Sequence, residues 1–374
     1  MRCLRLTQVA SIASLLLAVV LCLQADEAKF DRAAFDQSVT KAIDYLRTHG
    51  QAADGSYSAQ AGPAITAIVT TAVLKHGRSP DDPLVAKSLK YLEGFVNQDG
   101  GVYPKDSKLQ NYETSIALIC FAAANREGRY DKLLAGAEKF VKKLQWDGEE
   151  GHDESSTYHG GAGYGGHSRP DLSNTQFLLD ALKAAGRGAD DPAVKKALIF
   201  VSRCQNLETE HNTTPFSAKN PDGGFYYTPA AGGTSQAGNT PDGGLRSYGS
   251  MTYAGLKSMI FAGVKSDDPR VKAATQWLRE HYTLDENPGM GQNGVFYYYH
   301  TMAKSLDALG QPTFEDASRQ THNWRSEMLA EILKRQKADG SWINETPRWL
   351  EGDPNLATAY ALLVLDYCRL EKSK

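Results

Sequence analysis

The chain has 374 residues, 41% of them hydrophobic, and a formal net charge of −3. That length and apolar content suffice to bury one large core or two ordinary ones. The mildly acidic balance, without basic runs, lacks the electrostatic footprint of a nucleic-acid-binding protein, so we expect no nucleic acid partner. Its 5 cysteines include no Cys-x-x-Cys pair, and we predict no disulfide framework, no metal site and no cofactor.

The first residues of the chain have the pattern of an export signal. Arg2 and Arg5 form a basic start, an apolar run follows, and the small residue Ala25 ends the segment. The apolar run is shorter than the roughly 20 residues that a membrane span requires, and no later segment supplies such a run. We therefore predict a signal peptide over residues 1–25, export to the periplasm or the medium, and no integral membrane span. A lipoprotein alternative would use Cys22.

Short turns built on Asp-Gly or Asn-Gly recur through the rest of the chain. The spacing between them is about 45 to 50 residues where nothing is inserted, and each interval holds two helical patterns. The sequence therefore predicts a repeat of helical hairpins. In chain order, the turns are Asp54-Gly55, Asp99-Gly100, Asp147-Gly148, Asp222-Gly223, Asn293-Gly294 and Asp339-Gly340.

The helix before each turn is amphipathic and is predicted to face solvent on one side. In residues 191–201, Val194, Ala197 and Val201 share a face, while lysines lie off it. Several of these helices begin with Asp-Pro, which places a capping carboxylate before a proline whose missing N–H costs nothing there. Three of the predicted outer helices begin at Asp82, Asp191 and Asp268. The other three are Phe35–Leu46, Asp131–Leu144 and Trp324–Arg335, which completes a set of six.

The helix after each turn is apolar nearly all round, so it must be buried on most sides. The predicted inner helices are Ala64–Leu74, Thr114–Ala124, Thr175–Ala185, Thr252–Ala262, Tyr299–Leu309 and Leu356–Tyr367. Counting back from their ends aligns a column of hydroxyl residues, which we expect to satisfy exposed N–H groups near the helix starts. The column is Thr66, Thr114, Thr175, Thr252, Tyr299 and Thr358.

The last inner helix has no following repeat to cover its apolar surface, so the first hairpin is its best partner. We therefore predict an all-α protein, an α/α toroid of six helical hairpins that forms a single domain over residues 26–374. Its inner helices would surround an axial cavity, and its outer helices would face water.

The turns also carry a resemblance to known families. The segment Gln336–Trp342 resembles the Gln-to-Trp repeat of squalene and hopene cyclases. The segments Gln98–Tyr103 and Pro221–Phe225 are similar to turns in the β subunits of protein prenyltransferases. The resemblance extends over the whole predicted domain as repeats and implies the terpenoid cyclase and prenyltransferase toroid fold.

The reactions of these families are not indicated by the motifs present. The resemblance implies an Asp-x-Asp-Asp acid for class II cyclases, and no such string occurs. The Asp-Asp pairs run on to proline, as helix caps do, instead of forming a magnesium motif. The turn at Asp242-Gly243-Gly244 lacks the cysteine that prenyltransferases use to bind zinc. Whether the chain is an enzyme is left open.

Two enlarged connections, residues 147–170 and 206–249, are predicted to lie at one mouth of the ring. Long loops in a compact repeat fold are more often functional than neutral. Histidines there could act as general base or metal ligand, oriented by aspartate, with arginine holding an anion. The candidate catalytic residues are His152, Asp153, His159, His167 and Asp171. The alternative is a glycine-rich loop whose polar groups satisfy its own backbone.

A second set of residues is predicted to bind a ligand near the axis. It consists of Arg169, Asn174, Tyr253, Tyr298, Tyr299 and His300. Stacked aromatic side chains that simply fill a narrow ring are the alternative for the tyrosines.

The leading functional hypothesis is an exported toroid that binds an apolar or amphipathic small molecule, such as an isoprenoid, or a peptide. One alternative is an extracytoplasmic enzyme that uses the loop histidines and aspartates, either a polysaccharide lyase or hydrolase or a divergent terpene cyclase. The other is a protein-interaction repeat module. The size and lining of the central cavity separate these readings.

Overall fold

A computed structural model describes residues 30–166 and 168–369. Within them the fold is helical, apart from one antiparallel hairpin of β1 (Phe314–Glu315) and β2 (Thr321–His322). The predicted helical class is therefore confirmed. The predicted signal peptide lies outside the described residues and stays a prediction. No helix in the described part of the chain is long and apolar enough to cross a bilayer.

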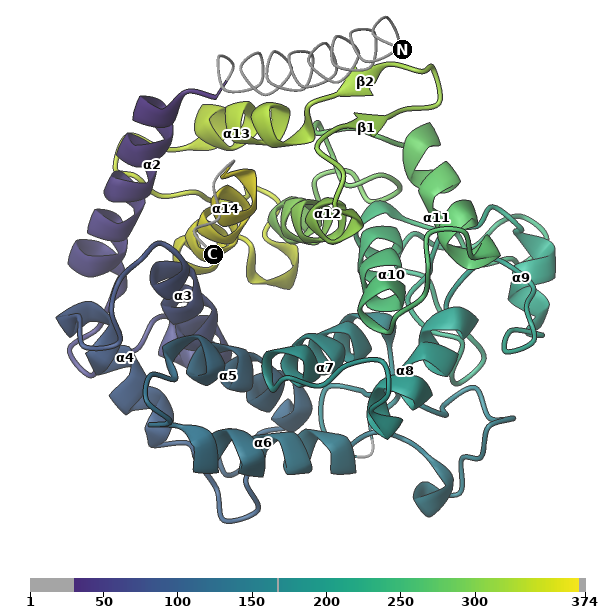
Figure 1. Cartoon of the computed structure of the whole chain (residues 1–374), viewed down its shortest axis with the longest axis horizontal. Helices are drawn as coiled ribbons and strands as arrows, with labels where there is room; N and C mark the ends of the chain where they lie inside the picture. Colours follow the sequence, from purple (N-terminus) through teal and green to yellow (C-terminus); the bar gives the residue numbers. More distant parts are fainter. Residues whose placement is uncertain (1–29, 167, 370–374) are drawn as a thin grey trace, which may run out of the picture.

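The inner helices form a closed ring (Figure 1). Each contacts the next along the chain, and the last one, α14, contacts the first, α3. Each is buried over most of its surface, as its apolar sequence requires. They are α3 (Pro63–Lys75), α5 (Gln110–Ala124), α7 (Leu172–Ala184), α10 (Gly249–Phe261), α12 (Val295–Leu309) and α14 (Pro354–Cys368).

The outer helices surround this ring (Figure 1). Each buries one face. The predicted Asp-Pro caps are confirmed, since Asp82 and Asp191 each accept a hydrogen bond from a backbone N–H of the first turn, at 3.0 and 2.9 Å. The outer helices are α2 (Arg32–Tyr45), α4 (Pro83–Glu93), α6 (Asp131–Lys143), α8 (Pro192–Arg203), α11 (Pro269–Glu280) and α13 (Trp324–Arg335).

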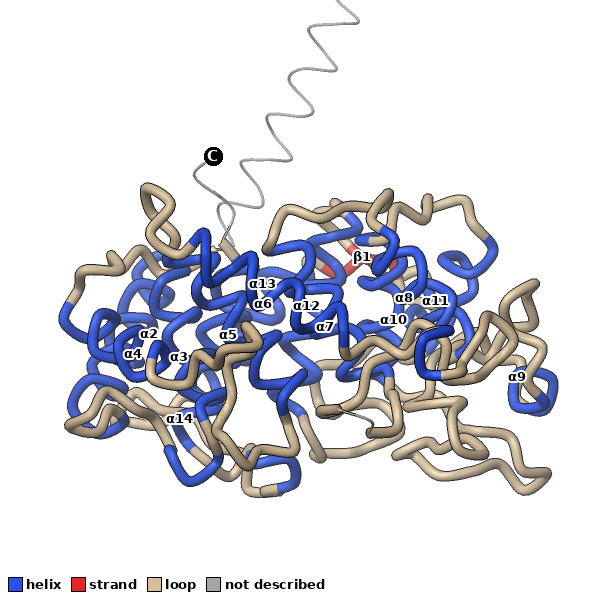
Figure 2. The backbone as a smooth tube through the Cα atoms, turned by 90° about the horizontal axis from the view of Figure 1, so that it is seen from below, coloured by secondary structure: helices blue, strands red, loops and turns tan. Residues whose placement is uncertain are grey.

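The remaining helical segments are short and lie in the connections. They are the π-helical η1 (Leu46–Gly50), the 3-10 turns η2 (Ala59–Ala61), η3 (Gly148–Glu150) and η4 (Arg348–Leu350), and α9 (Pro215–Lys219). Seen edge-on, the molecule is a flat disc, and long loops extend from the edge that carries α9 (Figure 2).

Glycines in most of the repeated turns lie against the backbone of the next outer helix, whereas a Cβ atom on Gly294 would meet the Trp349 ring. A Cβ atom added to Gly55 would lie 2.4 Å from the Lys87 carbonyl oxygen in α4. At Gly340 the same atom would lie 2.4 Å from the Lys41 carbonyl oxygen in α2. Both glycines also have a positive φ. Glycine is therefore required both by the backbone conformation and by the close contact. The contact of Gly340 joins the last repeat to the first.

Glutamine side chains reinforce these junctions. The Gln336 Nε2 atom donates to the Gly340 carbonyl oxygen at 2.9 Å and to the Ser38 carbonyl oxygen of α2 at 3.0 Å. Gln145 and Gln205 bridge their own turns to α8 and α11 in the same way. One side chain therefore satisfies two backbone carbonyls in two different repeats.

The third turn differs from the prediction. Gln145 donates to the carbonyl oxygen of Gly160, and a Cβ on Gly160 would overlap the Lys196 carbonyl of α8. Gly160 therefore occupies the junction, and the predicted turn at Asp147-Gly148 was wrong. The residues between Gln145 and Gly160 form an insertion inside the turn. A Cβ atom on Gly148, within this insertion, would meet no atom within 4 Å.

The threonine column is present, but it has a different role from the predicted one. Each threonine Oγ1 accepts a hydrogen bond from a backbone N–H in the preceding turn or connection, at 2.9 to 3.1 Å. The column therefore joins the turn to the inner helix. It does not satisfy the N–H groups at the start of that helix. The members are Thr66, Thr114, Thr175, Thr252 and Thr358, and Tyr299 departs from the pattern.

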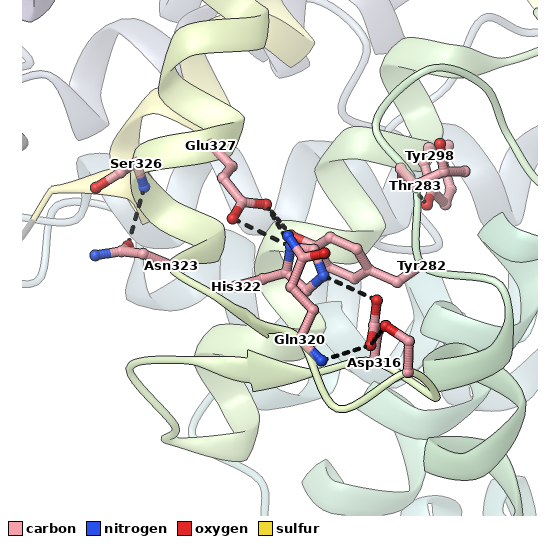
Figure 3. Close-up of polar contacts among 10 residues, drawn as sticks. Tyr282, Thr283, Tyr298, Asp316, Gln320, His322, Asn323, Ser326 and Glu327 are labelled. Carbon is pink, nitrogen blue, oxygen red and sulfur yellow. Dashed lines mark hydrogen bonds and ion pairs between the residues drawn. The ribbon is translucent and has the colours of Figure 1, made fainter.

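A polar cluster holds the β1–β2 hairpin against the outer ring (Figure 3). The His322 Nδ1 atom lies 3.0 Å from Glu327 Oε2 in α13, and its Nε2 atom lies 3.3 Å from Asp316 Oδ2. The Tyr282 hydroxyl donates to the same Glu327 carboxylate at 3.0 Å. Both ring nitrogens of His322 are engaged, so this cluster anchors the connection between α12 and α13.

The junction predicts unequal costs for two glycine substitutions. Gly340→Ala adds a positive-φ strain of about 1–2 kcal/mol and an overpacking cost of about 1–3 kcal/mol against α2. Gly186→Ala shares the positive φ, but its Cβ would meet no atom within 4 Å, so only the strain remains. Urea denaturation should show the larger loss of unfolding free energy for Gly340→Ala. Equal losses for the two variants would contradict the role of the junction.

Candidate functional site

Two cavities lie along the axis of the ring. The loop-side cavity, about 290 Å³, is lined by residues from the N-terminal halves of the inner helices. The lysine-side cavity, about 280 Å³, is lined by residues from their central and C-terminal parts. Phe177 and Tyr360 line both cavities, so these two side chains lie between them.

The loop-side cavity has an aromatic wall. The Tyr112 and Phe177 rings meet edge to face at 5.5 Å, and the Tyr297 and Tyr360 rings do so at 6.1 Å. Such arrangements leave ring faces and edges available to an apolar guest. The tyrosines in the lining are Tyr112, Tyr164, Tyr227, Tyr248, Tyr297 and Tyr360.

The two enlarged connections form part of the rim of this cavity. Tyr164 comes from the first connection and Tyr227 from the second, and both line the cavity. The second connection is bonded to the start of α7, because the Leu172 N–H donates to the Tyr227 carbonyl oxygen at 2.8 Å. The Thr228 hydroxyl donates to the Pro170 carbonyl oxygen at 2.7 Å. The rim is therefore held by hydrogen bonds between the connections.

A third segment, η4, completes the rim. Trp349 and Leu350 line the cavity and are 42% and 54% exposed, which is unusual for large apolar side chains of this protein. Both have positive φ angles, of 56° and 66°, a strained conformation for residues other than glycine. Arg348 donates to Gln236 of the second connection at 2.7 Å and so ties η4 to it.

Glu351 is the acidic residue in the lining of the loop-side cavity. Its Oε1 atom accepts a hydrogen bond from the Tyr297 N–H, and its Oε2 atom accepts one from Asn344 Nδ2, both at 2.7 Å. Burial raises the pKa of the Glu351 carboxyl above its usual range. The side chain therefore caps the start of α12 and has its oxygens occupied.

Asp171 caps the start of α7 next to the same cavity. Its carboxylate accepts hydrogen bonds from the Asn174 N–H at 2.8 Å and from Asn174 Nδ2 at 2.7 Å. Burial raises the pKa of Asp171 to about 6, opposed by the bonds from Asn174 and from the Tyr227 hydroxyl. Asp171 thus contacts the cavity wall through Tyr227 and does not line the cavity itself.

The structure brings two predicted loop histidines together outside the cavities. The His159 Nδ1 atom lies 2.9 Å from the His152 carbonyl oxygen, and the His152 ring stacks on Tyr158 at 4.5 Å. Asp153 accepts hydrogen bonds from Ser155 in its own turn. None of these residues lines either cavity, and His167 lies outside the described residues.

The predicted ligand-binding residues divide between the rim, the ring wall and the axis. Arg169 is exposed, donates to Thr234 at 3.0 Å and lies over the Tyr227 ring. Asn174 supports Asp171, and His300 lines the lysine-side cavity. Of these six residues, His300 is the one that lines a cavity.

Tyr253, Tyr298 and Tyr299 are buried in the wall of the ring and line neither cavity. The Tyr298 and Tyr299 hydroxyls donate to the carbonyl oxygens of Thr283 and Leu284, at 2.7 and 2.5 Å. These carbonyls belong to the connection after α11, so the two side chains join the inner helix to that connection. The predicted role of these tyrosines in ligand binding stays a prediction.

The helical period contains the signal that locates the axis. On α12, Tyr297, His300 and Lys304 line the cavities, at spacings of three and four residues. On other inner helices, lining residues such as Phe177 and Tyr360 come two positions after the threonine column. Alignment of the column could therefore have identified both side chains.

The described residues bring one acidic group together that could hold a cation, namely Asp147, Glu149 and Glu150. Asp147 forms an ion pair with Lys196 and accepts from the Glu149 N–H at 2.9 Å, while Glu150 accepts from the Asp147 N–H at 3.0 Å. This is the pattern of a capping box at η3. The predicted lack of a metal site stays a prediction.

A family model, the squalene-hopene cyclase C-terminal domain, matches residues 17–228, which is more than half of the chain. A comparison with curated protein sequences finds no match.

Among solved structures, the type II terpene cyclase MstE from Scytonema is similar. A variant in complex with geranylgeranyl dihydroxybenzoate is 12% identical, with a TM-score of 0.34, over 90% of this chain and 97% of that chain. A variant in complex with merosterolic acid A is 13% identical, with a TM-score of 0.33 over the same shares. The apo form is 12% identical, with a TM-score of 0.33 over 89% of this chain and 98% of that chain.

Asp171 predicts a pH dependence of stability. Its pKa is raised from 3.8 to about 6 on folding, so its stabilising contribution is complete below pH 3.8 and is lost as the pH rises through 6. Asp171→Asn should remove this loss, making the variant gain about 2–3 kcal/mol relative to the wild type between about pH 4 and 7. Denaturant unfolding at several pH values measures the difference.

Asp191→Asn provides the matched control. Asp191 also caps a helix, but hydrogen bonds, first from Lys142, outweigh its burial and hold the pKa of this carboxyl below its usual value. The wild type should therefore gain stability relative to Asp191→Asn as the pH rises through the acidic range. The same slope for both variants would contradict the environment assigned to Asp171.

Proposed function

The chain belongs to the family of squalene-hopene cyclase C-terminal domains, and from that premise we propose that it is a ligand-binding α/α toroid. Its ligand is an apolar or amphipathic small molecule, and its binding site is the loop-side cavity. The observation that carries this proposal is the aromatic wall around a cavity of about 290 Å³. A volume of this order is near the lower end of the roughly 300–1,000 Å³ of small-molecule sites.

The lining supports a ligand with a hydrocarbon chain and a small polar group. Ring edges and apolar side chains cover most of the wall, and burial of a hydrocarbon against them is worth about 25 cal/mol per Å². The Tyr297 hydroxyl lies 3.2 Å from Ser173 Oγ and 3.3 Å from Gln176 Nε2, and so offers a polar contact within the wall. An isoprenoid alcohol combines these two properties.

Binding is better supported than acid-catalysed cyclisation. The sequence contains no Asp-x-Asp-Asp string. Glu351, the acid in the cavity lining, is engaged by backbone N–H groups and by Asn344, so it lacks a free oxygen to direct at a ligand. The His152 and His159 pair lies outside the cavities and gives no support to a hydrolase or lyase.

The site of action in this proposal is outside the cytoplasm. It rests on the sequence of residues 1–25, with a basic start and an apolar run that match an export signal. An exported carrier would meet apolar ligands that have little solubility in water, which is the situation that an aromatic cavity serves.

Farnesol is a suitable first probe. At a free concentration about 100 times its Kd, mass action adds about 2.7 kcal/mol of stability, which should raise the Tm by about 4 °C for a domain of this size. Ser173→Phe should abolish that shift, because Ser173 is partly buried, lines the cavity, and a phenyl ring there would occupy the ligand's volume. Differential scanning fluorimetry measures both effects.

Ser173→Ala is the matched control, since it removes the hydroxyl and leaves the cavity open. It should keep a farnesol shift in Tm, and the lost polar contact should weaken the free energy of binding by about 1 kcal/mol or less. A full shift in Ser173→Phe, or no shift in the wild type with farnesol or geranylgeraniol, would refute the proposed binding site.

A further inference from the structure

The lysine-side cavity has a different chemistry from the loop-side cavity. The Asp180 Oδ2 atom lies 2.7 Å from both Lys257 Nζ and Lys304 Nζ, and Asp307 forms an ion pair with Arg325 at 2.9 Å. Positive charge exceeds negative charge around this end of the axis. The lining has Lys75, Lys183 and Lys304 against the carboxylates of Asp180 and Asp307. Arg325 pairs with Asp307, and burial lowers the pKa of Lys257, which pairs with Asp180, to about 7.

Two buried polar atoms in the lining have no hydrogen-bond partner. They are His300 Nδ1 and Asp180 Oδ1, in side chains that belong to residues 8% and 5% exposed. Buried polar atoms in folded proteins are nearly always satisfied, so His300 Nδ1 indicates room for a further polar group, whereas the ionised Asp180 Oδ1 can only accept a hydrogen bond and gives no support to an anionic one. Burial lowers the pKa of His300 to about 3, which keeps this ring neutral and able to donate or accept.

The inner part of this cavity is apolar. Ile68, Ile116 and Phe177 line it toward the centre of the ring, while Lys183 and Lys304 lie on the later turns of their helices. Lys183 Nζ lies 3.3 Å from the centroid of the Phe261 ring, which also lines the cavity. The lining therefore changes from hydrocarbon near the centre of the ring to ammonium groups toward the C-terminal ends of the inner helices.

We propose that the lysine-side cavity is a second ligand site, which takes a small anionic amphiphile with a carboxylate group. Lys183 and Lys304 hold the carboxylate, and the short hydrocarbon chain lies against Ile116 and Phe177. The proposal does not depend on the proposed function, because Phe177 and Tyr360 separate the two cavities.

The lysines could also have a purely structural role. The experiment must distinguish that role from the binding of an anion. The C-terminal ends of the inner helices meet at this side and carry partial negative charge, and lysines in the last turns offset it. That role alone predicts effects on stability but none on the binding of an anion.

Isothermal titration calorimetry with octanoate and octan-1-ol on the full chain tests the site. Octanoate should bind, and Lys183→Gln should weaken it about tenfold, the cost of one charge-assisted hydrogen bond. Octan-1-ol should bind to Lys183→Gln and wild type alike. Lys183 is exposed, so the variant should fold, and Lys183→Arg should retain the affinity for octanoate.

Lys195→Gln is the matched control, an exposed lysine on the outer helix α8, and it should leave octanoate binding unchanged. Ser173→Phe should also leave it unchanged, which distinguishes this site from the loop-side cavity. Three results would overturn the proposal: no heat of binding for octanoate, equal affinity in Lys183→Gln, or loss of octanoate binding in Ser173→Phe.

Discussion

The close approach of a turn glycine to the next outer helix, found at every repeated turn except Asn293-Gly294, is the constraint from which the rest of the architecture follows. A Cβ at Gly340 would lie 2.4 Å from a carbonyl oxygen of α2, and Gln336 hydrogen-bonds the same helix. Because the last junction engages the first outer helix, the ring closes and no apolar inner helix is left without a partner. Closure also encloses the axis, where the side chains leave a cavity at each end.

The two cavities differ because the inner helices all point the same way. Helix N-terminal ends carry partial positive charge and C-terminal ends partial negative charge. Asp171 and Glu351 cap helix starts at the loop side, whereas Lys183 and Lys304 lie toward the other end. The long connections also meet at the loop side, so that end gains its tyrosine rim. One parallel arrangement thus produces an aromatic site at one end and a cationic one at the other.

The sequence was sufficient for the helices and their caps, because period and capping chemistry are local. It was insufficient for the third turn, where an insertion separates Gln145 from Gly160. The insertion contains an Asp147-Gly148 pair that resembles a repeat turn but does not lie at the junction. The predicted ligand-binding set contains Tyr298 and Tyr299 but omits Tyr297, although the helical period directs Tyr297 to the axis and Tyr298 to the wall. The bridge from Asp180 to Lys257 and Lys304 joins three helices, and no local pattern reveals it.

The central claim is that the loop-side cavity is a binding site, and a crystal structure of the protein grown with farnesol tests it most directly. The account predicts density for the chain inside the ring, in contact with Phe177 and Tyr297. Density confined to the outer surface of the ring, with the axial side chains closed upon one another, would contradict it.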